Sequence, residues 1–188
     1  MSALAAEFEG IELGDVRLNR RARKVLARLG DKPTASIPAA CGGWDETRAA
    51  YRLFDHDSVT AQQVLEPHYQ ASQKRMAAHR QVLCIQDTTE IDYTGKSDIE
   101  GLGPLNYEAR RGLYLHPTIA VTPERLCLGV IDAWSWSREP GSLGEEKGKR
   151  LIEEKESLRW LDGYRRVCDR QAELPDTQCI YVGDREAD

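Results

Sequence analysis

Two short apolar runs, each followed by an aspartate, constrain the fold of this chain most strongly. Val82–Ile85 has the character of a buried strand and leads into Asp87. Cys179–Val182 repeats the pattern near the end of the sequence and leads into Asp184. If the two strands lie side by side, the paired carboxylates can hold a divalent cation, as phosphoryl-transfer enzymes require. Either aspartate alone would more simply begin a loop, because aspartate commonly follows a strand.

Length and composition describe an ordinary globular chain. The 188 residues predict one domain, or one domain with an appended piece, and 40% of them are hydrophobic and 30% charged. No apolar run approaches membrane-spanning length, and residues 1–10 lack the basic start and apolar core of a secretory signal. The five cysteines are scattered without a Cys-x-x-Cys pair. They predict free thiols in a reducing cytosol, several of them in the core, and no zinc site.

The net charge of −5 conceals an asymmetry along the sequence. Residues 1–80 hold 12 Lys and Arg against 10 Asp and Glu, a balance of +2. Residues 81–188 hold 14 against 21, a balance of −7. The overall charge argues against a general nucleic-acid coat protein, but it leaves room for a local basic surface.

The N-terminal part predicts a helix with a cationic face. Asp15 suits the N-cap, the helix runs through Leu29, and Gly30 ends it. Five cations share one narrow face, with no acid four residues further on to pair with them. These residues are Arg17, Arg20, Arg21, Lys24 and Arg28. Such a face is often merely solvated, but its uniform sign favours phosphate contact.

Further helices are expected before residue 78. Residues 34–43 predict a loop, and a short helix follows over residues 45–54. Its expected packing side is Ala49, Ala50, Leu53 and Phe54. Ser58 or Thr60 caps the next helical stretch, which Pro67 either kinks or divides before about residue 78. We therefore predict a helical domain over residues 1–78 and a second domain over residues 79–188.

The second domain changes to strand periodicity. Residues 113–121 and 126–134 predict a hairpin, and the Gly-rich segment 97–112 predicts a loop over the sheet. A helix is expected over residues 155–172, before the second apolar run. Its expected buried side is Leu158, Leu161, Tyr164, Val167 and Cys168. The resulting order is strand, two-stranded hairpin, helix and strand.

This order matches the opening part of a ribonuclease-H-like fold, and six short stretches carry a more specific resemblance. They are Leu13–Leu18, Ala49–Arg52, Gln86–Thr89, Arg111–Gly112 with His116, Glu154–Ser157 with Trp160, and Asp184–Asp188. In this order along the chain, they resemble bacterial cut-and-paste DDE transposases of the transposon Tn-five type. The expected fold class is therefore α+β or α/β. A helical DNA-binding module precedes a truncated ribonuclease-H-like mixed sheet with its first four strands and one helix.

The resemblance implies roles for these residues. The N-terminal domain would bind double-stranded transposon-end DNA. The candidate contacts are Arg17, Arg20, Arg21, Lys24, Arg28 and Lys32, with Arg111 from the second domain. Asp87 and Asp184 would be the first two acids of the triad, which hold two Mg²⁺ or Mn²⁺ ions in the complete family enzyme. Arg111 either contacts DNA or is solvated, and Trp160 more often packs in a core than stacks on a base.

The resemblance also exposes a departure. The family's third acid is a glutamate on a later helix, and no stretch here carries its pattern. Glu186 is too close to Asp184 to replace it, and Glu153, Glu154 and Glu156 precede the last strand. We therefore expect weakened metal binding and a transposase fragment that is inactive alone. It is expected in the bacterial cytoplasm at the nucleoid, as a homodimer or in a mixed complex with a full-length transposase.

Two other functions fit the sequence. A haloacid-dehalogenase-like phosphatase also places an aspartate after its first strand, and Gly183–Asp188 resembles its late metal motif. That family needs a second aspartate where Thr89 stands, and a hairpin disagrees with its parallel sheet. The other candidate is an end-binding or inhibitory module, in which the helical domain holds DNA and the second domain performs no catalysis.

Overall fold

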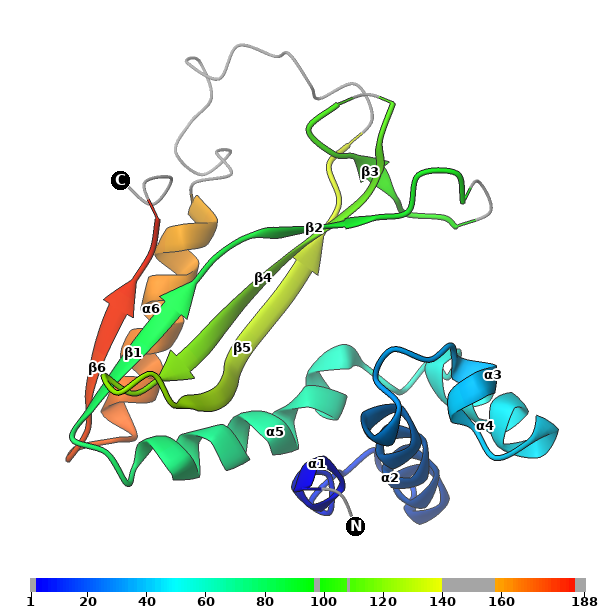
Figure 1. Cartoon of the computed structure of the whole chain (residues 1–188), viewed down its shortest axis with the longest axis horizontal. Coiled ribbons are helices and arrows are strands. Elements are labelled where there is room, and N and C mark those ends of the chain that lie inside the picture. The colour runs from blue at the N-terminus through cyan, green and yellow to red at the C-terminus, as the bar shows by residue number, and fades with distance from the viewer. Residues whose placement is uncertain (1–2, 97–98, 108, 140–157, 185–188) are drawn as a thin grey trace. The chain divides into compact units, whose positions relative to one another are not determined.

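The computed structural model describes residues 3–96, 99–107, 109–139 and 158–184 (Figure 1). The chain divides into two compact units, residues 1–71 and 72–188. Helices form the first unit, and a mixed six-stranded sheet dominates the second, which confirms the predicted α+β class. The division falls within helix α5 (Ala61–Met76), whereas the sequence-based boundary lies just beyond the end of that helix.

Helix α2 (Val16–Asp31) is the central helix of the first unit. It follows the short α1 (Ala3–Glu7), and the Asp15 carboxylate caps it by accepting from the backbone N–H of Arg17 at 2.7 Å. The prediction that Gly30 ends this helix is wrong, because the helix continues through Gly30 to Asp31. Lys32 is the C-cap and donates its backbone N–H to the carbonyl of Leu29.

The first unit has its own apolar core. The core comprises Ile11, Leu13, Leu18, Ala22, Val25, Cys41, Ala50 and Leu53. Buried Asn19 joins the preceding loop to α2, because its Oδ1 accepts from the backbone N–H of Leu13 at 2.7 Å. This bond satisfies a polar side chain that would otherwise be costly to bury.

The remaining helices of the first unit differ from the sequence-based expectation in detail. The expected loop contains α3 (Ile37–Ala40), and α4 spans Trp44–Phe54 as predicted. Phe54 does not pack as expected, since 47% of it is exposed. α5 runs without interruption through Pro67, and Thr60 caps it through reciprocal hydrogen bonds with Gln63 at 3.0 and 3.2 Å.

All four predicted strands are present in the second unit. They are β1 (Gln81–Gln86), β4 (Arg111–Val121), β5 (Cys127–Trp136) and β6 (Gln178–Val182). Two further strands were not predicted, namely β2 (Thr89–Asp92) and β3 (Gly103–Pro104). The first is short and mostly polar, and the second is two residues long within the expected Gly-rich loop.

The long strand β4 organises the sheet. It pairs antiparallel with β5 along one edge, as the predicted hairpin requires, and with both β1 and β2 along the other. β3 also pairs with β4, and β6 pairs parallel with β1, as the ribonuclease-H-like order predicts. The antiparallel pairing of β1 and β4 does not fit the doubly wound parallel sheet of the phosphatase alternative.

Helix α6 (Leu158–Ala172) packs against β1 and β6, as Figure 1 shows. Its buried residues are Trp160, Gly163 and Val167. The predicted packing face is therefore largely wrong, because Leu161, Tyr164 and Cys168 are exposed and only Val167 of the expected set is buried. The core beneath comprises Met76, Val82, Cys84, Ala120, Leu128, Ile131, Val167 and Leu174.

The cysteines are free thiols. Cys41 and Cys84 lie in the two cores, Cys179 is half-buried, and Cys127 and Cys168 are exposed. Within the described residues, none of the helices combines the length and the apolar character that crossing a bilayer requires.

Candidate functional site

The paired strands bring Asp87 and Asp184 to the same edge of the sheet. β1 and β6 run parallel with Ile85 opposite Val182, and each aspartate follows two residues later. Both side chains are exposed, and both raise the pKa of the same buried histidine, His116, through their charge. The two carboxylates therefore act on one neighbourhood at the carboxyl ends of adjacent parallel strands, where α/β proteins commonly build sites.

This donor set suits a hard divalent cation. Mg²⁺ is typically bound by one or two carboxylates and keeps several waters. Asp87 Oδ1 accepts the backbone N–H of Thr88 at 2.8 Å, and its Oδ2 has no protein partner among the described residues. Within the same residues, no three His, Cys, Asp or Glu side chains gather closely enough to form a metal cluster by themselves.

Buried polar side chains lie directly behind Asp87. His116 on β4 is fully buried, and its Nδ1 lies 2.7 Å from the Thr88 hydroxyl. Its Nε2 lies 3.2 Å from Gln86 Oε1, and Gln86 Nε2 donates to Thr118 Oγ1 at 2.7 Å. With the amide oxygen of Gln86 facing the ring, Nε2 carries the proton and Nδ1 accepts from Thr88.

Aromatic rings enclose this histidine. Its ring centroid lies 4.5 Å from that of Trp134 and 4.7 Å from that of Trp160, the latter edge-on. Trp160 is buried, which confirms the prediction that it packs in the core. Burial lowers the pKa of His116, although the carboxylates of Asp87, Asp132 and Asp184 partly oppose the shift. The imidazole is therefore neutral at physiological pH.

An ion pair and two cation–π contacts connect α6 with β5 next to these rings. The Arg166 guanidinium donates to both carboxylate oxygens of Asp132, at 3.0 and 2.8 Å. It also lies 4.6 Å from the centroid of the Trp134 ring. Arg159 lies over Trp136 in the same way, at 3.8 Å. α6 is thus attached to β5 by cation–π contacts as well as by apolar packing.

The predicted cationic face of α2 is present, but it is not unpaired. Glu46 of α4 accepts from Lys24 at 2.6 Å and from Arg28 at 3.1 Å, and Arg17 pairs with Asp15 at 3.3 Å. Three of the five cations therefore have acidic partners, although, as predicted, none of these acids lies four residues further on in the helix. Glu46 comes from a different helix, so spacing within α2 could not reveal it, whereas Asp15 is the N-cap of α2 itself.

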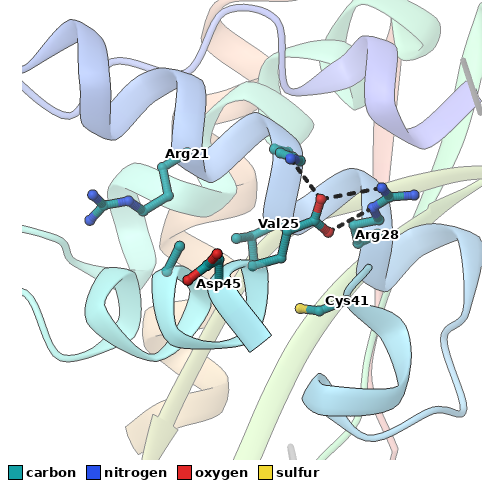
Figure 2. Close-up of a pocket in the computed structure, with 8 residues that line it drawn as sticks. Arg21, Val25, Arg28, Cys41 and Asp45 are labelled. Atoms are coloured by element: carbon teal, nitrogen blue, oxygen red, sulfur yellow. Dashed lines mark hydrogen bonds and ion pairs between the residues drawn. The ribbon is translucent and has the colours of Figure 1, made fainter. Parts of the chain in front are cut away.

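The Glu46 carboxylate borders a small pocket between α2 and α4 (Figure 2). The pocket has a volume of about 200 Å³, and Figure 2 shows Arg21, Val25 and Arg28 lining it. Lys24, the backbone N–H of Gly42 and Arg28, in that order, lower the pKa of Glu46 to about 2. Glu46 is thus the acid that fixes the geometry of this basic surface.

The other predicted DNA contacts of the first unit form no ion pair among the described residues. Arg20 is exposed, Arg21 is half-buried, and exposed Lys32 donates to the carbonyl of Ala39 at 3.1 Å. The basic surface of the first unit therefore contains two arginines, Arg20 and Arg21, that are not fixed by Glu46. Phosphate contacts favour cations of this kind, because displaced counterions contribute to the binding free energy.

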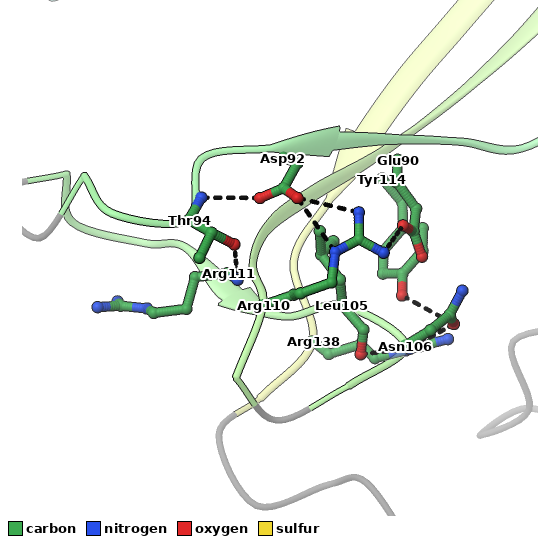
Figure 3. A network of polar contacts seen from close by, with 9 residues as sticks. All are labelled: Glu90, Asp92, Thr94, Leu105, Asn106, Arg110, Arg111, Tyr114 and Arg138. Carbon is green, nitrogen blue, oxygen red and sulfur yellow. Dashed lines mark hydrogen bonds and ion pairs between the residues drawn. The ribbon is translucent and has the colours of Figure 1, made fainter.

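Arg111 lies far from α2 in sequence, beside a polar network on the sheet (Figure 3). Its guanidinium donates to the carbonyl of Leu102 at 3.3 Å, and Figure 3 shows the side chain directed away from the network. Neighbouring Arg110 instead binds Glu90 at 2.7 Å and Asp92 at 3.0 Å. Arg110 stabilises the β2–β4 ribbon, whereas Arg111 is exposed at its edge.

Sequence reasoning missed two groups of residues. One is the set behind Asp87, because the resemblance included His116 without giving it a role; the signal is the alternation of His116 and Thr118 on β4 opposite the carboxylate-bearing strand. The other is the exposed face of α4, where Trp44 is 75% and Tyr51 51% exposed and Arg48 lies between them in sequence. Aromatic and arginine side chains on one helix face suit nucleic acid, because both stack on bases and sugars.

Several predicted residues fall outside the described structure. These are the motif stretch 154–157, the terminal stretch 185–188, and the dismissed acids Glu153, Glu154, Glu156 and Glu186. The helix expected to begin at Lys155 is described from Leu158 onward.

Comparison with known families identifies the character of the first unit. Residues 1–59 match the family model described as transposase DNA-binding. Over these residues the first unit is similar to transposase DNA-binding domains, which supports a transposase-related DNA-binding role. A comparison of the chain with curated proteins gives no match. The family match covers α1 to α4, including the whole basic face of α2 and the exposed face of α4.

Proposed function

We propose that this chain binds double-stranded transposon-end DNA and that Asp87 and Asp184 form the carboxylate pair of a metal-dependent phosphodiester cleavage site. The observation that carries the catalytic part is the parallel register of β1 and β6, which gives the two aspartates the same offset at one sheet edge. The family match over residues 1–59 supports the DNA-binding part.

DNA binding is assigned to two faces of the first unit. Arg20 and Arg21 offer cations to the phosphate backbone, while Lys24 and Arg28 are oriented by Glu46. Trp44 adds an exposed ring for contact with sugars or bases. Phosphate contacts supply affinity and set the register on the duplex, and contacts with base edges supply sequence preference.

Catalysis is assigned to the sheet edge of the second unit. Asp87 and Asp184 would hold Mg²⁺ or Mn²⁺, which when bound activates the attacking water or 3′-hydroxyl and stabilises the leaving oxygen. The protein's own contribution is to orient the carboxylates rigidly at the ends of two hydrogen-bonded strands. Positioning of this kind accounts for much of the rate of phosphoryl transfer.

The DNA-binding part can be tested without knowing the end sequence. The full chain is first used to select bound duplexes from a pool with a randomised core. The affinity of the chain for the selected duplex is then measured as a function of salt concentration. Arg20→Ala and Arg21→Ala should weaken binding and each reduce the salt slope by about one. Arg23→Ala is the matched control, because Arg23 belongs to the same helix, α2, but lies outside its cationic face. Equal effects of all three substitutions would contradict the assigned face.

Cleavage is tested on the selected duplex with Mg²⁺ or Mn²⁺. Any nicking by the unmodified chain should be abolished by Asp87→Asn and by Asp184→Asn, with DNA binding unchanged. Asp176→Asn, an exposed acid of the same unit, is the control for the charge change. Binding without nicking by the unmodified chain would instead favour the end-binding module. In that case excess chain should inhibit transposition by a full-length enzyme that shares the same ends, through competition or mixed complexes.

A further inference from the structure

A single imidazole holds both chain neighbours of Asp87. His116 Nδ1 accepts from the Thr88 hydroxyl at 2.7 Å, and its Nε2 donates to Gln86 Oε1 at 3.2 Å. Gln86 and Thr88 are the residues directly before and after the carboxylate. Thr88 also donates its backbone N–H to Asp87 Oδ1 at 2.8 Å, so the contact extends to the carboxylate itself.

The hydrogen bonds of the His116 side chain act at a gap in the backbone pairing of β4. β4 pairs with β1 up to Gln86 opposite Thr118, and with β2 from Thr89 opposite Leu115. The continuous register sets Asp87 opposite Pro117. Proline has no N–H to donate, and neither Asp87 with Pro117 nor Thr88 with His116 is a ladder pair. The side-chain hydrogen bonds of His116 attach both ends of this gap to β4, because Gln86 is the last residue of β1 and Thr88 directly precedes β2.

We call the hydrogen bonds from His116 to Gln86 and Thr88 the His116 clamp. Two of its three residues, His116 and Gln86, are tightly packed. His116 is fully buried between two tryptophan rings. Gln86 is 2% exposed and is fixed from behind by Thr118. The glutamine amide also lies so close to Gly163 of α6 that a Cβ there would be 2.2 Å from Oε1. Few alternative rotamers are therefore open to Gln86, and its position fixes that of the ring.

We infer that His116 is a positioning residue that, through Gln86 and Thr88, holds the Asp87 carboxylate ready for a divalent cation. The inference rests on the proposed cation site at Asp87 and Asp184. A ligand that is already fixed loses less conformational entropy when the ion binds, so affinity rises. Partners that orient metal ligands typically contribute 10- to 100-fold in affinity.

The test measures Mn²⁺ affinity of the full chain by electron paramagnetic resonance and calorimetry, without DNA. Thr88→Val removes the hydroxyl while keeping the size and branching of the side chain. It should weaken Mn²⁺ binding about tenfold or more. Thr88→Ser restores the hydroxyl and should return the affinity to within about twofold of the unmodified chain. Thr89→Val is the matched control, because Thr89 is adjacent and exposed.

A second readout does not depend on metal. The ring ¹⁵N signals of His116 should report a protonated Nε2 and an accepting Nδ1 in the unmodified chain. The Nδ1 signal should shift in Thr88→Val and stay unchanged in Thr89→Val. Melting curves without metal establish that the variants fold, which Thr88→Val is expected to do even if substitution of buried His116 itself unfolds the chain.

The outcomes separate this inference from the proposed function. Unchanged Mn²⁺ affinity in Thr88→Val, with loss of binding in Asp87→Asn, would overturn the clamp and leave the cation site standing. Unchanged affinity in Asp87→Asn would overturn the cation site and the clamp with it. Failure of Thr88→Ser to restore binding would assign the effect to shape rather than to the hydroxyl, and would also overturn the clamp.

Discussion

The Lys24 ammonium lies 2.6 Å from Glu46 Oε1, and so an acid of α4 is attached to the basic face of α2. The same carboxylate accepts from Arg28 at 3.1 Å and from the backbone N–H of Gly42 at 2.7 Å. Glu46 therefore does two things. It joins α2, the α3–α4 connection and α4, and it neutralises part of the surface assigned to DNA.

Glu46→Gln should strengthen binding to a random-sequence duplex. The substitution removes the charge that competes with phosphate for Lys24 and Arg28. The salt slope should become steeper by about one to two, because one or two more counterion-releasing contacts form. Asp57→Asn is the control, since Asp57 is an exposed acid of the same unit without an ion pair in the described structure. An equal gain in both variants would attribute the effect to net charge alone.

The Glu46 carboxyl should titrate with a pKa of about 2 in the folded chain, below its ordinary value of 4.5. Because the folded-state pKa is lowered, the stabilisation is present above pH 4.5 and is lost as the pH falls toward 2. Carboxyl-detected ¹³C NMR measures this directly. Lys24→Met should raise the pKa of Glu46 toward 4.5, because Lys24 is the largest cause of the shift. Arg23→Met, on the same helix, should leave it unchanged.

Local sequence patterns determine the cap of α2 and the strands of the second unit, but not the contacts between elements. The Asp15 cap and the strand character of the runs before Asp87 and Asp184 follow from short-range chemistry, and both are confirmed. The parallel pairing of these strands was predicted from the order of the elements along the chain, and it is also confirmed. The buried face of α6 was predicted wrongly, because periodicity favoured its large apolar residues while the sheet selects Gly163 for close approach. Only the tertiary fold brings Glu46 to α2. The pairing of helices and strands decides such contacts, and no spacing rule within one element reveals them.

Gly163→Ala should destabilise the second unit. An added Cβ would lie 2.2 Å from Gln86 Oε1, so the glutamine or the helix must move. Overpacking of this kind typically costs about 1–3 kcal/mol, which exceeds the roughly 1 kcal/mol that alanine gains over glycine in a helix. Chemical denaturation measures the difference. Asp169→Ala, at an exposed position of α6, should be neutral or slightly stabilising. If the Gly163→Ala chain were as stable as the unmodified one, Gln86 or α6 would be able to shift without a loss of stability, which would contradict the prediction.

Arg166→Met should destabilise the contact between α6 and β5. The Asp132 side chain is only 12% exposed and receives both of its contacts from Arg166, so truncation leaves a largely buried carboxylate without its partner. We expect a loss of about 1–3 kcal/mol. That is less than for a fully buried pair, because the Arg166 side chain is 46% exposed and water can replace part of it.

Arg165→Met is the matched control for this substitution. Arg165 is the adjacent residue, and its ion pair with Asp162 at 3.2 Å is exposed, so its loss should change stability by less than about 0.5 kcal/mol. Arg166→Lys should recover only part of the loss, because an ammonium can donate to Asp132 as Nη1 does but has no planar group to lie over the Trp134 ring. Asp132→Asn should cost less in the Arg166→Met background than in the unmodified chain, since the buried charge is then already unpaired. Additive effects of the two substitutions would contradict the coupling and would leave the apolar packing of α6 as the main attachment to the sheet.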